Sequence, residues 1–573
     1  MPPQILRPWR APLLPHAVAL AAAWVALTPS LLPRSALFQG LLCAVAGLLG
    51  YGVGAFLHWI ARGVGIRPSP GARLWARRGL ALLALLGTAT MLWLAHVWQQ
   101  DQRAAIGMPP AAPSDPLVAV AVAVVVFALL LIVARAVRGA GRRVIGFVDR
   151  FMPHSIAVAV GLLLVGWATV WLVNGVAVGR VAASLDRVYL AVNDEFIDVA
   201  PPTAPELSGS PASSVSWESL GRQGRVFIAN APSADQIAEF MAAPGGAAGP
   251  SAPAMQPIRA YAGGDAEAHL DLPGQARTAL AELERTGAFD RAVLNVVTGT
   301  GRGWVNENQA RALEFMWGGD TATVSMQYSY LPSWMSYLVD GQRARDAGRA
   351  LFEAVYAKWE TLPEGDRPLL VVSGESLGSF GSEGAFGSAQ DLAARTDGGL
   401  YVGPTANNVL WQQFTAERNA GSPVFLPVTD DGRTVRFSPD GRDWPGADGA
   451  GNGAEGWAQP RIGYIQHAND PVTWLDFSEV ITPPEWLLGE RGPGVPDAMI
   501  WAPVVTTLQL AVDQLASGVP DGQGHEFGQA PAYAWATILP PEGWSDGETD
   551  RLAATLAQLR ILDIDTDTSA SSE

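Results

Sequence analysis

Residues 368–378 read Pro-Leu-Leu-Val-Val-Ser-Gly-Glu-Ser-Leu-Gly. An apolar, β-prone run leads into the pattern Gly-x-Ser-x-Gly, and small residues follow it. This order predicts a strand, a sharp turn and a helix, with Ser376 raised at the turn. The turn crowds the positions two residues before and after the serine, which accounts for Gly374 and Gly378. The stretch therefore predicts a nucleophilic serine at the carboxyl end of a strand.

This motif needs support from its context, because the chain contains 62 Gly in 573 residues. In a chain of this composition Gly-x-Ser-x-Gly arises by chance about 0.4 times. The alternative interpretation is a glycine-rich loop after a buried strand. The apolar run before the motif, the small-residue segment after it and the partner residues downstream favour the nucleophile.

Charge divides the chain into two unlike parts. Residues 1–180 contain 15 Arg and 3 Asp, whereas the whole chain has 38 basic and 54 acidic residues and a net charge of −16. A basic, apolar N-terminal part and an acidic C-terminal part predict a membrane region followed by a globular domain. The acidic C-terminal part argues against nucleic acid as a partner, because phosphates require a basic surface. The single cysteine, Cys43, excludes an intramolecular disulfide and a cysteine-based metal site.

Five apolar runs in the front part are each near the ~20 residues that a helix needs to cross a bilayer. They cover residues 16–33, 37–61, 79–98, 117–137 and 155–178. Arginines gather before the first run, between the second and third, and between the fourth and fifth, so the positive-inside rule places these segments in the cytoplasm. With five spans, the C-terminal part emerges outside. The runs contain no Asp, Glu or Lys, which favours an anchor over a transporter.

We expect a transmembrane anchor over residues 1–185, a linker over 186–222 and a globular domain over 223–573. In the globular domain strands alternate with helices, which is typical of a mostly parallel sheet. A Gly- and Asp-rich segment at about 405–459 is predicted as an insertion that forms a lid or cap, with a surface loop as the alternative. The expected strands are 225–229, 258–261, 291–297, 322–328, 368–374, 400–403 and 461–467, and the expected helices are 273–286, 306–316, 340–361 and 382–395.

A serine hydroxyl becomes a nucleophile when a histidine takes its proton and an acid orients that histidine. Only His467 and His525 follow Ser376, and His525 lies in a glycine-rich loop near the end of the domain. We predict His525 as the general base, with a surface histidine in a turn as the alternative. Asp470 is the predicted acid because it closely follows a strand; the alternative is a turn aspartate before proline. His467 precedes that acid and is interpreted as a packed or hydrogen-bonded neighbour. The reserve acids are Asp476 and Glu479.

An oxyanion intermediate needs backbone N–H donors beside the serine. The N–H of Leu377 is the first predicted donor, because it follows the nucleophile directly. The glycine-rich loop 298–303 is expected to supply the second through Thr300 and Gly301, with a plain tight turn as the alternative. The loop lacks the Gly-Lys-Ser/Thr ending of a phosphate-binding loop. No cofactor and no metal are predicted.

Several segments carry a resemblance to a known family. They are Glu-Arg-Thr-Gly-Ala-Phe-Asp-Arg at 284–291, Gln-Tyr-Ser-Tyr-Leu-Pro-Ser-Trp at 327–334, the motif at 374–378, Asp-Pro-Val at 470–472 and the loop 519–525. The chain resembles an actinobacterial family of membrane-anchored α/β-hydrolase-like proteins. The resemblance covers the apolar runs and the globular domain, and it implies Ser376, Asp470 and His525 as the triad without supplying a substrate. One departure is that residues 503–517 favour a helix where a strand is expected before the histidine.

Together these features predict a multi-pass protein of the cell membrane with an extracytoplasmic α/β-hydrolase domain. The expected activity is that of a serine esterase or lipase acting on an acyl or lipid-like ester through an acyl-Ser376 intermediate. Two alternatives remain. The first is an acyltransferase of envelope lipids or glycans, and the second is a non-catalytic envelope interaction protein on a hydrolase scaffold. The oligomeric state is left open.

Overall fold

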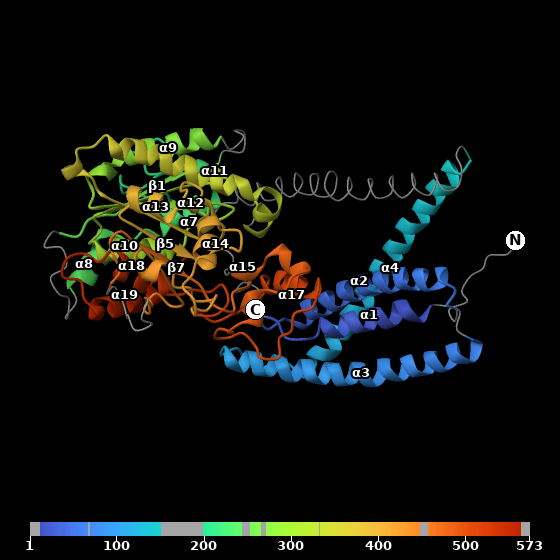
Figure 1. Cartoon of the computed structure of the whole chain (residues 1–573). Coiled ribbons are helices and arrows are strands. Elements are labelled where there is room, and N and C mark those ends of the chain that lie inside the picture. The colour runs from blue at the N-terminus through green and yellow to red at the C-terminus, as the bar shows by residue number, and fades with distance from the viewer. Residues whose placement is uncertain are drawn as a thin grey trace. The chain divides into compact units, whose positions relative to one another are not determined.

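The computed structural model describes residues 12–66, 69–150, 199–242, 253–264, 271–331, 333–446 and 456–562. The chain forms two compact units (Figure 1). The bundle unit combines Met1–Val173 with Asn469–Gly524, and the sheet unit combines Asn174–Ala468 with His525–Glu573.

Apolar helices make up the first part of the bundle unit. In residues 12–150 these are α1 (Leu13–Val25), α2 (Ala36–Gly63), α3 (Pro70–Ala105) and α4 (Asp115–Val148). Of the described helices, α2, α3 and α4 are long and apolar enough to cross a membrane. This is fewer than the five predicted spans. The first predicted span is a short helix that ends before Pro29 and Pro33, and the fifth, residues 155–178, lies outside the described residues.

The surface of these helices suits hydrocarbon better than water. Trp59 of α2, Trp75 and Leu85 of α3 and Leu117 of α4 are each about 70 % exposed. Such large apolar side chains are normally buried when a helix packs in a water-soluble core. The helices therefore support membrane association of this unit.

The bundle unit also contains residues 469–524, which we call the excursion. Its helical elements are α15 (Pro471–Trp474), η7 (Phe477–Val480), α16 (Glu485–Leu488) and α17 (Val505–Asp513). α17 packs against α2. A segment far along the sequence thus shares one compact unit with the apolar N-terminal helices.

The sheet unit is built on a seven-stranded, all-parallel sheet with the strand order β1-β3-β2-β4-β5-β7-β6. This confirms the prediction of a mostly parallel sheet. The strands are almost fully buried, because helices cover both faces, and this explains their continuous apolar runs. The strands are β1 (Ile258–Ala262), β2 (Val293–Thr298), β3 (Thr321–Met326), β4 (Leu369–Glu375), β5 (Gly398–Val402), β6 (Val435–Ser438) and β7 (Arg461–Ile465).

Helices form a layer on each face of this sheet (Figure 1). One layer contains α9 (Leu272–Thr286), α11 (Ser333–Glu360), α12 (Leu377–Glu383) and α13 (Ala389–Arg395). The other contains α8 (Ala234–Ala242), α10 (Glu307–Met316), α18 (Ala530–Ile538) and α19 (Asp546–Gln558). The remaining helical elements are η3 (Glu218–Leu220), α7 (Gly221–Ala229), η4 (Ala288–Asp290), η5 (Glu364–Asp366), α14 (Val409–Ala416) and η6 (Asp430–Gly432).

Two local predictions are wrong. Residues 225–229 form part of the helix α7 and not a strand, because a short apolar run cannot be assigned by periodicity alone. The expected helix 382–395 is two helices, α12 and α13, and α12 begins directly after Ser376.

Part of the predicted linker is folded onto the sheet unit. Leu207 pairs with Arg259 of β1 in an isolated bridge, and Leu207, Trp217 and Leu220 are buried in a shared apolar cluster. A linker boundary at residue 222 is therefore too late. The predicted insertion at 405–459 likewise contributes β6, which pairs with β7 at the edge of the sheet, so this part of it is not a lid.

Glu282 of α9 holds residues 208–214 in place. Its carboxylate accepts hydrogen bonds from Ser208 at 3.0 Å, from Ser213 at 2.8 Å, from the Ser214 N–H at 2.9 Å and hydroxyl at 2.7 Å, and from Arg285 at 2.8 Å. Burial alone would raise the pKa of Glu282, but the bonds from Arg285 and the serines lower it to about 2.

Glu282→Gln is expected to destabilise the protein at neutral pH by about 2–3 kcal/mol. The folded pKa lies below the unfolded value of 4.5, so this stabilisation is complete above pH 4.5 and is lost as the pH falls toward 2. Thermal unfolding of the two proteins in detergent between pH 3 and 7 should show a gap that narrows on acidification. Glu284→Gln on the same helix, whose exposed carboxylate pairs with Lys358 at 2.9 Å, is the matched control. A gap that is constant with pH would contradict the assignment.

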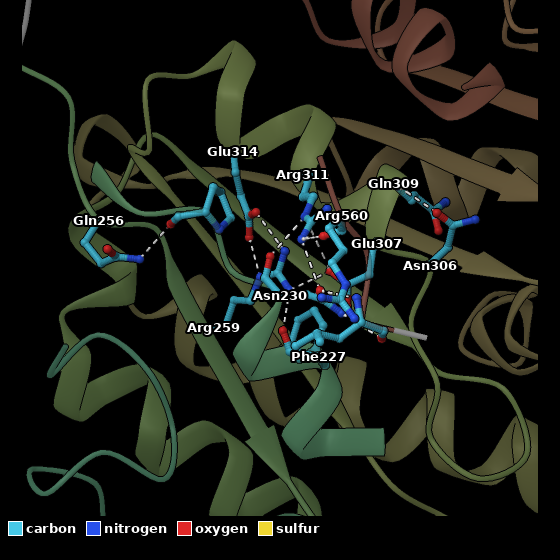
Figure 2. A network of polar contacts seen from close by, with 12 residues as sticks. Phe227, Asn230, Gln256, Arg259, Asn306, Glu307, Gln309, Arg311, Glu314 and Arg560 are labelled. Atoms are coloured by element: carbon cyan, nitrogen blue, oxygen red, sulfur yellow. Dashed lines mark hydrogen bonds and ion pairs between the residues drawn. The ribbon is translucent and has the colours of Figure 1, made fainter. Parts of the chain in front are cut away.

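A buried cluster of charges joins β1, α7 and α10 (Figure 2). The Arg259 guanidinium donates to Glu314 at 2.7 and 2.9 Å and to Glu307 at 2.8 Å, and it lies 4.5 Å from the ring centre of Phe227. Arg311 donates to the Asn230 carbonyl at 2.9 Å. Burial alone would lower the pKa of Arg259, but the two carboxylates raise it. The cluster fixes the first turns of α10, which contribute to the site described below.

Candidate active site

Ser376 lies at a strained turn between β4 and α12. Its backbone has φ 54° and ψ −124°, a conformation that non-glycine residues rarely adopt. The Ser376 N–H donates to the carbonyl of Val402 at the end of β5 at 2.9 Å. Ser376 is partly exposed, whereas Glu375 before it and Leu377 after it are buried. The turn thus holds the serine at the carboxyl edge of the sheet, where solvent or a substrate can reach it.

The two glycines of the motif are required by close backbone contacts. A Cβ on Gly374 would lie 2.5 Å from the Gly378 carbonyl oxygen, and a Cβ on Gly378 would lie 2.3 Å from the Thr298 carbonyl oxygen of β2. Neither oxygen belongs to a side chain that could rotate away. The turn can therefore form at this place only if both positions lack a side chain.

Gly378→Ala is expected to displace α12 from β2, to destabilise the chain by about 1–3 kcal/mol and to misplace Ser376. Gly387→Ala is the matched control, because a Cβ there meets only the Asp391 carboxylate, at 3.9 Å. Thermal unfolding and reaction of Ser376 with a fluorophosphonate report the two effects separately. Equal behaviour of the two variants would contradict the close approach.

The imidazole of His525 lies against the end of β5. A Cβ built on Gly403 would be 2.5 Å from Cε1 and 3.0 Å from Nδ1 of His525, so the ring covers this glycine. Gly403 directly follows Val402, whose carbonyl accepts the Ser376 N–H. The tertiary fold thus brings His525 to the same sheet edge as Ser376.

Phe527 supports the His525 ring from one side. It makes an edge contact with His525 at a centroid distance of 5.4 Å and stacks on His467 at 4.6 Å. His467 is buried and lies beside this pair, in agreement with its interpretation as a packed neighbour. Sequence reasoning missed Phe527 and Gly403. The signal for Gly403 was a glycine at the end of a predicted strand.

The first turn of α10 ties three parts of the site together. Asn306 caps α10 and its side-chain amide donates to Glu375, the residue before the serine. Asn308 donates to the Gly528 carbonyl at 2.9 Å and so holds the loop after His525. Gln309 donates to the Leu400 carbonyl of β5 at 3.1 Å. One helix terminus therefore positions the nucleophile strand, the neighbouring strand and the histidine loop.

A buried polar network lies under α12. Glu383 accepts hydrogen bonds from Asn408 at 2.9 Å, from the Tyr464 hydroxyl at 2.8 Å and from the Leu410 N–H at 2.8 Å. Asn408 also donates to Ser379, whose hydroxyl donates to the Ser376 carbonyl at 2.7 Å. Burial raises the pKa of Glu383. The network links the backbone of Ser376 to β7 and α14 and restricts how the serine can move.

The predicted oxyanion donors differ in their geometry. Leu377 is the first residue of α12, and the N–H groups of a first helical turn have no partner within the helix. The Thr300 N–H instead donates to the Trp304 carbonyl at 2.8 Å, because the loop closes on itself as a turn. Thr300 is therefore a poor donor to an oxyanion, and Gly301 is left as the candidate from this loop.

Asp470 is fully buried in the bundle unit, where it caps α15. Its carboxylate accepts from the Val472 N–H at 2.8 Å and from the Thr473 hydroxyl at 3.2 Å. The pairing of Asp470 with His525 stays a prediction. The reserve acid Glu479 is less suitable, because burial raises its pKa to about 8 and a protonated carboxyl cannot stabilise an imidazolium.

Comparison with known families gives two matches. Residues 258–552 match a family described as an alpha/beta-hydrolase family, and residues 27–232 match one described as the N-terminus of an alpha/beta-hydrolase family. Curated proteins and solved structures give no significant match. The first match covers the sheet with Ser376 and the loop with His525, and the second covers the apolar helices α2, α3 and α4.

Proposed function

The chain belongs to this α/β-hydrolase family, and from that premise we propose that it is a membrane-anchored serine hydrolase that cleaves acyl or lipid-like esters. The observation that carries the proposal is the strained Ser376 at the same sheet edge as the His525 imidazole. A non-glycine residue whose backbone is held in such an unfavourable conformation is typical of a functional site.

In the proposed reaction the Ser376 hydroxyl attacks the ester carbonyl while His525 takes its proton. The resulting oxyanion accepts hydrogen bonds from the N–H groups of Leu377 and Gly301. His525 then protonates the departing alcohol, and the acyl group remains on Ser376. Water attacks this acyl-enzyme with His525 again as the base, which releases the acid and restores the serine. Asp470 is the proposed acid that orients the histidine.

The sheet unit is proposed to lie outside the cytoplasm, and the bundle unit supports this without the fifth span. The α1–α2 connection lies beside the end of α3, since Gln102 donates to the Ser30 carbonyl at 2.7 Å and Gln99 accepts the Arg34 N–H at 3.0 Å. The excursion binds the same end, where Gln509 donates to the Thr28 carbonyl at 2.9 Å. Most arginines of this region lie at the opposite ends of α2, α3 and α4. The positive-inside rule therefore places the excursion, and the chain joined to it, outside.

The test is labelling of the membrane-inserted chain with a fluorophosphonate probe, with wild type beside Ser376→Ala and His525→Ala. We expect strong labelling of wild type and none of the variants, because the probe reacts only with an activated serine. Addition of an envelope lipid or glycan acceptor then separates hydrolysis from acyl transfer by the product formed. Folded wild type that does not label would overturn the proposal in favour of a non-catalytic interaction protein.

A further inference from the structure

The excursion exposes a group of large apolar side chains. The apolar patch consists of Phe477, Ile481, Ile500 and Val504, which are 60 %, 79 %, 49 % and 37 % exposed. The patch comes from two chain segments, 477–481 and 500–504, that two hydrogen bonds hold together. The Val504 N–H donates to the Val480 carbonyl at 3.0 Å, and the Trp501 indole donates to the Glu479 carbonyl at 2.9 Å. Such a concentration is costly in water and marks a surface with an apolar partner.

Val504 adds a second unusual feature to the apolar patch. Its backbone has φ 66°, although a β-branched side chain is strained at positive φ. This conformation precedes α17 directly and coincides with an outward-facing apolar side chain. The backbone at Val504 is therefore strained. A loop that only faced water would be more stable with a glycine or a polar residue at this position.

Polar contacts bind the excursion firmly to the N-terminal helices. Asp513 of α17 accepts the Leu32 N–H at 3.2 Å and lies 3.7 Å from the Arg34 guanidinium, and both charged side chains are at most 1 % exposed. Gln509 donates to the Thr28 carbonyl. A buried ion pair requires a defined arrangement of its two partners. It therefore fixes the position of α17 on the connection between α1 and α2.

The buried apolar cluster that α17 shares with α2 reaches into the depth of a bilayer. Val505 belongs to a buried cluster with Leu42 and Ala46, and Ala46 is ten residues beyond the first residue of α2. At 1.5 Å per residue, Ala46 lies about 15 Å from the start of α2, which is about 42 Å long. The hydrocarbon core of a bilayer is ~30 Å thick, so when α2 is centred in the bilayer the first ~6 Å of the helix lie outside the core. Ala46, and with it the buried cluster, then lies inside the core. The apolar patch, next to α17, then lies at the level of the lipid surface.

We propose that the excursion is an interfacial segment whose apolar patch enters the outer face of the lipid bilayer, so that the hydrolase takes its ester directly from the membrane. The inference rests on the proposed ester hydrolysis and narrows the substrate to an ester of a membrane lipid. The excursion begins with Asn469, next to the predicted acid Asp470, and its last residue, Gly524, precedes His525. The Asn469 side chain binds both the Gly524 N–H at 3.0 Å and Gln523 at 2.9 Å, which closes the segment at its base.

Depth of insertion is measured with single nitroxide labels on the full chain in phosphatidylcholine–phosphatidylglycerol vesicles. Cys43 is the only cysteine, so Cys43→Ala provides the background for Ile481→Cys and for the control Val409→Cys, an exposed apolar position of the sheet unit. We expect the label at 481 to collide with dissolved oxygen and to be shielded from a water-soluble nickel chelate, and the label at 409 to show the reverse. Equal access of the nickel chelate to both labels would overturn the proposal.

Activity provides the second measurement. The double variant Phe477→Ser with Ile481→Ser should lose at least about tenfold in hydrolysis of a vesicle-embedded lipid ester, because two apolar side chains no longer enter the bilayer. Its hydrolysis of a monomeric short-chain ester should match wild type, as should both activities of Val409→Ser. Equal losses on both substrates would overturn the interfacial role. If wild type hydrolyses neither ester, the proposed hydrolase function is wrong. The membrane contact of the excursion is still decided, because the depth of the label at residue 481 measures it independently of activity.

Discussion

Hydrolysis of a monomeric short-chain ester is expected to fall by roughly 10⁴-fold or more in Ser376→Ala and by a similar factor in His525→Gln. In the proposed mechanism the serine supplies the attacking oxygen and His525 supplies the base, because its ring covers Gly403 at the end of β5 and the Ser376 N–H binds the neighbouring Val402 carbonyl. Because the two act as a unit, the double variant should be no slower than either single variant. The measurement is kcat and KM with a chromogenic ester for the full chain in detergent.

His467→Gln is the matched control for this prediction. His467 stacks on Phe527, which in turn contacts His525, so its loss should disturb the base only through packing. We expect a loss of about tenfold or less, with fluorophosphonate labelling retained. A collapse of activity in His467→Gln with a normal rate in His525→Gln would reverse the assignment of the base.

Arg259→Met is expected to destabilise the sheet unit by about 3–5 kcal/mol. The methionine keeps apolar bulk beside Phe227 but removes the cation of the buried Glu314 and leaves Glu307 only the more distant Arg311, at 4.0 Å. The measurement is the thermal unfolding midpoint of the full chain in detergent. Lys358→Met, which removes the cation of a half-exposed pair, should change stability by less than about 1 kcal/mol.

Compensating variants test the cause of that loss. Adding Glu307→Gln and Glu314→Gln to Arg259→Met removes the uncompensated charges and should restore part of the stability. The same cluster positions α10, whose first turn holds Glu375 and the loop after His525, so the destabilised single variant should also react more slowly with a fluorophosphonate. A triple variant less stable than Arg259→Met would show that the charges do not dominate the loss.

Much of the fold was predictable because it depends on short-range patterns. The apolar runs at β2, β4 and β7 identified buried strands, and the alternation with helices indicated a parallel sheet. The edge of the sheet was not predictable. In the described residues 514–529 no strand precedes His525, and the edge strand β6 comes from a Gly- and Asp-rich segment that has no strong strand pattern.

The sequence by itself determined the turn at Ser376, because the backbone conformation there depends on neighbours that are two residues away. Gly374 and Gly378 can be read from the sequence, and the close contact of Gly374 with the Gly378 carbonyl follows from the turn itself. The contact of Gly378 with the Thr298 carbonyl of β2 exists only in the tertiary structure. Only the tertiary structure decided which distant groups meet that turn. Segments between about 25 and 480 residues apart are joined by the contact of His525 with Gly403, by the network from Glu383 to the Ser376 carbonyl, and by the hydrogen bond between Asp513 of α17 and Leu32 in the connection between α1 and α2. No local pattern encodes such contacts, because they arise only when strand order and helix packing bring separate segments together.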